Sequence, residues 1–472
     1  MIRTNYSKAL AALFAVLMVV SMIAPVAGAS VAADAGDATA AMETPGDTPA
    51  LSGDASYEQM SDRAYDQQDT DDVEIDPALE DKFENGAASE SGADGGTVDV
   101  VVRLSSADTS DVQSRSATID ALKSHADATQ ESVVRFAGST EYVDLERQFW
   151  ITNAVLLEVD PDRISLEEIA SAEGVERLHV NFEVTTAQAG GGNGSAGGSA
   201  PANETSTNET STDETSTDEA STSEAASGDS AASPDASADT EPVVPSSMLA
   251  DDYDTTYGLD MVNATEVWDE YNTQGEGVEV AVLDTGMDDS HPDLPELDDE
   301  HWQAWDDSGN PIESEPSDSD GHGTHVSGTV AGAEDPDGNV PSYGVAPDVE
   351  LYHGQVIPGG SGSFTQVAAG MEWAVEQDVD IISMSLGAAG YFTEMIEPSE
   401  NARDAGVVLV ASAGNGGAGT TGSPGNVYPN FASGAVNEAG DVAGFSGGET
   451  VDTSSAWGSD APADWPDEYV VP

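Results

Sequence analysis

The sequence has 472 residues, of which 90 are Asp or Glu and 12 are Lys or Arg, giving a formal net charge of −78. This charge excludes a nucleic-acid binder, because phosphate backbones are recognised by cationic side chains. Carboxylates this numerous repel one another in dilute buffer, whereas at molar salt the Debye length falls to about 3 Å and the repulsion is screened.

After Arg177 the only Lys or Arg is Arg403, so most carboxylates in that half have no cationic partner. The acidity also runs through segments with apolar periodicity. We therefore interpret it as an adaptation to high salt, with disorder as the alternative in individual segments. The sequence contains no cysteine, which excludes disulfide bonds.

Residues 1–29 are predicted to be an export signal. Arg3 and Lys8 precede an apolar run over residues 9–24, and small residues at 27–29 offer a cleavage site. The absence of an Arg-Arg pair favours general secretion over twin-arginine export. An uncleaved membrane anchor is the alternative, although the run is slightly short for a span. We expect a secreted protein with no other membrane contact.

Residues 30–96 are acidic and poor in large apolar side chains, which predicts a disordered spacer. Over residues 97–186 the pattern is strand, helix, strand, strand, helix, strand, which is typical of a small ferredoxin-like α+β module. Residues 187–245 are glycine-rich and then repeat an imperfect Ser/Thr/Glu pentapeptide. Because this segment has no apolar residues that could form a core, we expect a low-complexity linker.

Apolar runs alternate with helical stretches over residues 246–472. The runs predict strands buried on both faces, and the stretches between them predict helices. Such alternation indicates a parallel sheet covered by helices on both sides, an α/β fold of three layers. The predicted strands are 278–283, 379–386 and 407–411, and the predicted helices are 322–331, 364–376 and 397–405.

Three residues with catalytic chemistry follow or adjoin these strands. Asp284 ends the first strand, His322 opens a helix, and Asn415 follows the last strand. Functional groups collect at the carboxyl ends of parallel strands, so we expect all three at one edge of the sheet. An Asp that orients a His, a His that takes a proton and an amide that binds an oxyanion are parts of an acyl-transfer site.

Several motifs in consistent order resemble the subtilisin family of serine proteases. The acidic composition makes the exported, halophilic, halolysin-like branch the nearest part of that family. The resemblance implies a subtilisin-like three-layer sheet for residues 246–472, polypeptide substrates, and an inhibitory propeptide for residues 97–186 that acts on its own chain. The motifs are Asp284-Thr285-Gly286, Ser290-His291-Pro292-Asp293-Leu294, His322-Gly323-Thr324-His325-Val326-Ser327-Gly328, Gly344-Val345-Ala346-Pro347, Ser385-Leu386-Gly387 and Ala413-Gly414-Asn415-Gly416-Gly417.

The resemblance also implies roles for single residues. Asp284 would orient His322, His322 would act as general base and then general acid, and the Asn415 amide would donate to the oxyanion. Two segments align with those that flank the substrate, namely Gly360-Ser361-Gly362 and Ser385-Leu386-Gly387.

A structural Ca²⁺ is a further expectation. Asp293 matches a calcium ligand of the family, and the loop with Asp335, Asp337 and Asn339 offers oxygen donors suited to Ca²⁺. Solvated carboxylates are the alternative in so acidic a chain.

Other histidines have simpler interpretations. His325 is one helical turn from His322, but no Glu stands at zincin spacing, so we expect a buried supporting residue rather than a metal ligand. His301 and His353 have no motif and are expected at the surface.

The serine nucleophile of the family is missing from the sequence. It should follow Asn415, yet Ser454, Ser455 and Ser459 have no suitable motif. Ser446 stands in a Gly-x-Ser-x-Gly pattern, but no histidine follows it, as that mechanism requires. Residues 469–471 resemble the start of a buried strand. We therefore expect a chain truncated before its serine, incomplete at the C-terminal end of the sheet and inactive alone.

Three functions remain open at this point. The chain is part of a secreted serine endopeptidase, or a non-catalytic relative that binds peptides or a protease. The third possibility is a surface protein whose repeat linker is a glycosylated stalk.

Overall fold

The computed structural model describes residues 73–85, 96–110, 112, 114–186, 255–338 and 340–472. The predicted export signal, the low-complexity linker and most of the acidic spacer lie outside these residues. We call residues 73–186 the module and residues 255–472 the α/β domain; both belong to one compact unit. Within the described residues, no helix has the length and apolar character needed to cross a bilayer.

The module contains a five-stranded sheet in the order β1-β5-β2-β4-β3. Its central strands are runs of Val and Leu whose alternate side chains meet the helices on one face and the α/β domain on the other. The long helix α3 begins at Arg115 because the Ser114 side chain accepts a hydrogen bond from Ala117 N–H. The elements are β1 (Glu74–Ile75), α2 (Pro77–Asn85), β2 (Val98–Leu104), α3 (Arg115–Ser139), β3 (Val143–Phe149), β4 (Ala154–Val159), α4 (Leu166–Ala170), β5 (Val175–Val180) and β6 (Glu183–Thr186).

The module begins earlier than the sequence indicated. Strand β1 and helix α2 fall inside residues 30–96, where we expected a disordered spacer. Strand β1 pairs in parallel with β5, and Leu79 of α2 is fully buried in the module core. The few apolar residues of this short segment are sufficient only because the rest of the module covers them, which local composition does not reveal.

The α/β domain is built on a seven-stranded sheet in the order β16-β14-β12-β7-β10-β8-β9. Every strand pair in it is parallel except β8 with β9. The predicted parallel α/β fold is confirmed. The strands are β7 (Glu279–Asp284), β8 (Trp302–Trp305), β9 (Pro311–Ile312), β10 (Glu350–Gln355), β12 (Ile381–Met384), β14 (Val408–Ser412) and β16 (Phe431–Ser433).

Helices cover this sheet on both faces. Leu283 of β7 and Ile382 of β12 belong to the same core as helices α8 (Phe364–Glu376) and α9 (Ile396–Asp404). Val282 of β7 points the other way, into a cluster with helix α7 (His322–Ala331). Because successive strand residues alternate between faces, this division produces three layers. Short helices α5 (Tyr257–Met261), α6 (Ala264–Tyr271) and α10 (Thr453–Ala456) complete the domain.

One hydrophobic core joins the module to the α/β domain. Phe149 and Ile151 of the module belong to the same buried cluster as Phe364 and Met371 of α8. Helix α8 is consequently buried along nearly its whole length, although a helix on a sheet usually leaves one side in solvent.

The last residues of the chain do not form the buried strand that the sequence predicted. Residues 469–471 belong to β18 (Glu468–Val471), which pairs antiparallel with β17 (Glu449–Asp452). Val470 is 71% exposed, so this strand is not buried on both faces.

Candidate active site

Asp284 and His322 meet at the carboxyl edge of the sheet. Asp284 is the last residue of β7 and is fully buried, and His322 is the first residue of α7. The His322 Nδ1 and Asp284 Oδ1 atoms are 2.7 Å apart. Gly323 makes this approach possible, because a Cβ there would lie 2.2 Å from the carbonyl oxygen of Gly286.

The electrostatics of the pair favour a protonated Nδ1. A carboxylate can only accept hydrogen bonds, so Nδ1 of His322 donates, and Nε2 is left with its lone pair. The hydrogen bond to Asp284 raises the pKa of His322; burial opposes this, and the charges of Asp320 and Asp318 add to the increase. A histidine held in this tautomer can accept a proton at Nε2.

Asp318 connects the segment after β7 to the start of α7 through hydrogen bonds. Its Oδ1 accepts from Thr285 Oγ1 at 2.9 Å and from Gly321 N–H at 2.9 Å, while its Oδ2 accepts from Thr324 Oγ1 at 2.7 Å. Burial tends to raise the pKa of Asp318, but these hydrogen bonds outweigh it and the pKa is lowered. Sequence reasoning missed Asp318, because acidic residues are too frequent here for one to be conspicuous; its one signal is its place just before the turn into α7.

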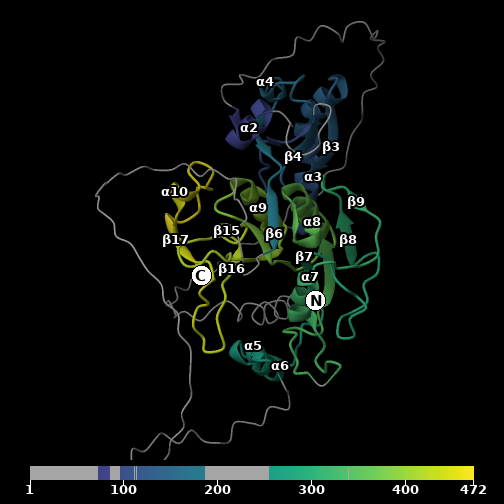
Figure 1. Ribbon diagram of the computed structural model, residues 1–472, viewed down its shortest axis with the longest axis vertical. Helices are drawn as coiled ribbons and strands as arrows, with labels where there is room; N and C mark the ends of the chain where they lie inside the picture. The colour runs from purple at the N-terminus through teal and green to yellow at the C-terminus, as the bar shows by residue number, and fades with distance from the viewer. Residues whose placement is uncertain (1–72, 86–95, 111, 113, 187–254, 339) are drawn as a thin grey trace, which may run out of the picture. The chain divides into compact units, whose positions relative to one another are not determined.

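Strand β6 of the module lies between two short strands of the α/β domain, and we call the binding site that these two strands form the groove. It runs antiparallel between β11 (Ser361–Ser363) and β13 (Leu386–Ala389), in a sheet that also contains β15 (Gly422–Ser423). Strands β11 and β13 follow β10 and β12, which are the two neighbours of β7 in the central sheet. Strand β6 therefore reaches the edge where β7 ends in Asp284, and in Figure 1 it extends from the module into the green part of the chain.

The groove holds β6 by its backbone and by alternate side chains. Val184 is fully buried and Thr186 is 8% exposed, whereas Glu183 and Thr185 face solvent. This is the pattern of an extended peptide bound by strand addition. The structure places all six predicted substrate-flanking residues here. Thr185 pairs with Ser361 and Gly387, Val184 pairs with Gly362, Thr186 pairs with Leu386, and Gly360 and Ser385 directly precede the two strands.

Asn415 lies at the same edge of the sheet. It follows the end of β14 by three residues, and β12 separates β14 from β7. The register pairs Ser383 of β12 with both Val282 and Val410, so the strands end at similar heights. The contribution of its amide to an oxyanion stays a prediction.

Two of the expectations about histidines are wrong. His325 is exposed rather than buried, because this turn of α7 faces solvent. His353 is fully buried rather than at the surface, because it lies on β10 inside the sheet, where its Nδ1 contacts Ser327 Oγ at 3.0 Å.

No described serine completes the pair. Within the residues that the structure describes, His322 has no hydrogen bond to a serine hydroxyl. Ser446 is buried in a loop, where its hydroxyl accepts from Ala435 N–H and donates to Gly447 O.

The residues expected to bind Ca²⁺ do not form a metal centre in the described part of the chain. Both oxygens of Asp293 accept hydrogen bonds from protein groups, Oδ1 from Asp337 N–H at 2.7 Å and Oδ2 from the Tyr343 hydroxyl at 2.8 Å. The side chains of Asp335 and Asp337 are exposed, and Asn339 lies outside the described residues. Both Asp293 oxygens therefore already have protein donors, and Ca²⁺ stays an untested prediction.

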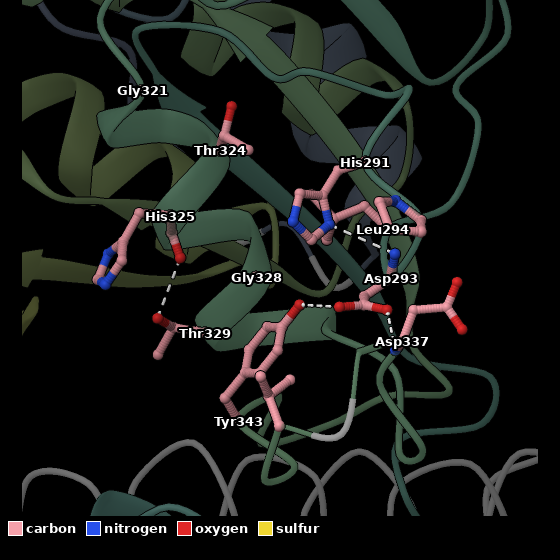
Figure 2. Close-up of a pocket in the computed structure, with 12 residues that line it drawn as sticks. His291, Asp293, Leu294, Gly321, Thr324, His325, Gly328, Thr329, Asp337 and Tyr343 are labelled. Atoms are coloured by element: carbon pink, nitrogen blue, oxygen red, sulfur yellow. Dashed lines mark hydrogen bonds between the residues drawn. The ribbon is translucent and has the colours of Figure 1, made fainter.

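This region borders a cavity of about 560 Å³ beside α7. Figure 2 shows the Tyr343 hydroxyl directed at Asp293 and the His325 ring turned away from Asp293. Neither Asp284 nor His322 is among the residues that line the cavity.

Comparison with known proteins identifies similar chains. Residues 275–465 match the subtilase family model, Peptidase S8. The chain is 39% identical over 212 residues to the major intracellular serine protease of Bacillus subtilis, covering 43% of this chain and 65% of that protein. It is 36% identical over 195 residues to subtilisin DY of Bacillus licheniformis, covering 40% of this chain and 67% of that protein. It spans roughly half to two thirds of the length of the curated relatives it matches.

Proposed function

This chain belongs to the subtilase family, and we propose that it carries the acid–base pair and substrate groove of a serine endopeptidase. The observation that supports this most is the Asp284–His322 pair at 2.7 Å beside a groove that already holds an extended strand.

In the proposed reaction, His322 Nε2 removes the proton of a serine hydroxyl as that oxygen attacks the peptide carbonyl. The imidazolium then protonates the leaving amine, and Asp284 stabilises its charge through Nδ1. The Asn415 amide donates to the oxyanion, an interaction worth about 10²- to 10³-fold in kcat in subtilisin. We place the nucleophile outside this sequence, because no serine after Asn415 stands in the family motif.

We further propose that the module inhibits its own chain. Strand β6 uses the backbone positions on β11 and β13 that a substrate would need, so substrate and module compete for one groove. In this proposal cleavage or release of the module precedes activity.

A second candidate is a non-catalytic chain that binds peptides. The pairing of β6 on both sides favours it, because strand addition needs no nucleophile. Such a chain would bind extended segments with a buried aliphatic side chain, as Val184 is here.

Location and salt requirement are also proposals. We propose secretion from the apolar run and cleavage site at residues 1–29, and a halophilic setting from the net charge of −78. The names of some relatives describe intracellular proteases, so secretion depends on this chain's own N-terminus.

The test is casein hydrolysis in molar salt, with this chain and with the product of the reading frame extended past residue 472. We expect turnover from the extended product alone, and its loss in His322→Ala. His325→Ala is the matched control, because it changes an exposed histidine one turn away on the same helix. Turnover that survives His322→Ala would contradict the proposal, and an extension without a nucleophile would favour peptide binding.

A further inference from the structure

Cations are divided unevenly between the two parts of the structure. Residues 255–472 contain one Lys or Arg, Arg403, whereas residues 98–186 of the module contain seven. Five of these seven form ion pairs with acidic residues of the α/β domain. These five cations make six ion pairs, namely Arg103–Glu397, Arg115–Asp378, Lys123–Glu376, Arg147–Glu372, Arg177–Glu394 and Arg177–Asp460.

Two of the pairs are buried. The Arg103 Nη2 and Glu397 Oε2 atoms are 2.5 Å apart, and each side chain is 11% exposed. Glu372 is paired with Arg147 at 3.1 Å and also accepts hydrogen bonds from the N–H groups of Trp150 and Ile151. A buried ion pair favours docking of a surface with the opposite charge at the matching position, because removing either member leaves the other charge buried without compensation.

Three of the pairs lie at the rim of the interface, where water and ions reach them. Glu376 is 44% exposed and Asp378 is 80% exposed. Asp460, 33% exposed, contacts Arg177 at 2.5 Å. Salt screens exposed pairs of this kind, whereas it affects buried pairs much less.

We propose that the module is held in place by an electrostatic latch, meaning these five module cations and their acidic partners, and that ionic strength regulates its release from the groove. Without the module, the acidic partners would repel one another. Salt weakens the latch and also screens that repulsion in the released domain, so both effects favour release as salt rises.

The ion pairs of the docked structure are the evidence for the latch. Only its consequence, access of substrate to the groove, rests on the proposed function. Because β6 belongs to the module and fills the groove, release would open the groove to substrate. The test below has no catalytic readout, so its failure is distinguishable from a failure of the proposed proteolysis.

The experiment measures amide hydrogen exchange of the full chain in KCl from about 0.5 M to about 3 M. Protection of β6 and β11 reports docking, and protection of the central strand β12 in the same sample reports global folding. We expect the protection of β11 relative to β12 to fall about tenfold across this range, the size expected from three exposed ion pairs.

The variant Glu376→Gln/Asp378→Asn/Asp460→Asn removes the rim acids. Its control, Asp269→Asn/Glu270→Gln/Glu438→Gln, makes the same charge change at exposed acids that have no ion pair among the described residues. We expect the rim variant to lose the β11 protection at low salt and to match the unsubstituted chain at high salt. If it does not fold at low salt, Lys123→Gln against Arg135→Gln makes the same comparison on helix α3, since Arg135 pairs with Glu131 inside the module.

Relative protection of β11 that does not decrease with salt would overturn the latch. So would an equal response of the rim variant and its control.

Discussion

At the scale of single residues, the site depends on charged groups whose surroundings fix their protonation. The sequence was sufficient to identify Asp284 and His322, because a short motif surrounds each of them. It did not reveal Asp318, which is one of many acids, or the burial of His353, because the strand β10 that carries it is not a continuous apolar run. The role of Asp318 and the burial of His353 both result from contacts between residues that are distant in the sequence, which a local pattern does not reveal.

Asp284→Asn should lower the pKa of His322. The hydrogen bond to Asp284 raises that pKa above 6.5, so its stabilising contribution is complete below pH 6.5 and is lost as pH rises through the higher folded-state value. An Asn in place of the carboxylate removes most of this effect. Nitrogen-15 histidine NMR measures the pKa, and Asp320→Asn, which removes charge without removing the hydrogen bond, should cause a smaller decrease.

Two buried histidines should each contribute a loss of stability in mild acid. Burial lowers the pKa of both His179 and His353 to about 3. Below pH 6.5 the unfolded chain binds protons that the native chain does not, so stability falls as pH falls, by about 1.4 kcal/mol per pH unit for each histidine.

Denaturant unfolding at constant salt between about pH 6.5 and pH 5 measures this slope. His353→Gln should remove its own contribution, up to about 1.4 kcal/mol per pH unit, whereas the exposed-site control His325→Gln should leave the slope unchanged. An equal slope in all three chains would refute the assignment.

The Asp293 site gives a prediction about metal removal. Because both Asp293 oxygens have protein donors, we expect a chelator to leave the melting temperature unchanged. Tyr343→Phe should instead cost about 1.5–3 kcal/mol, the range for a hydrogen bond to a charged group. A clear decrease in melting temperature with chelator would show that a metal ion contributes and would support the calcium prediction.

At the scale of elements, the strands that lie in apolar runs were predictable and the others were not. The predicted runs contain β7, β12 and β14 of the central sheet, whereas β8, β9, β10 and β16 were not predicted. Strands β6, β11 and β13 are three or four residues long, and each exists because its partners lie far away in the sequence. The groove therefore could be located from the family resemblance but not from periodicity.

Gly362→Ala should disturb the groove. A Cβ at Gly362 would lie 2.4 Å from Val356 O, so β11 must shift away and its pairing with β6 must weaken. We expect a loss of about 1–3 kcal/mol in stability and reduced protection of β6 from hydrogen exchange. Gly258→Ala is a suitable control, because nothing lies within 4 Å of a Cβ there. Equal protection of β6 in the two variants would show that the groove tolerates the methyl group.

At the scale of the whole molecule, the excess of negative charge determines how we expect stability to depend on salt. The net charge of −78 is visible in the sequence, whereas the division of cations between module and domain acquires meaning only once their ion pairs are known. We expect the melting temperature of the chain to rise with NaCl or KCl, because screening relieves carboxylate repulsion. Melting curves over a salt series test this, and greater stability in dilute buffer would contradict it.

Helix α8 has a consequence for cooperativity. Its residues belong to one core that includes Phe149 and Ile151 of the module and Leu283 and Ile382 of the sheet. If the module or the sheet separated from α8, residues of this core would expose apolar surface to water, which is unfavourable roughly in proportion to the area. At low salt, where the module is docked, heat should therefore unfold the module and the α/β domain in a single transition.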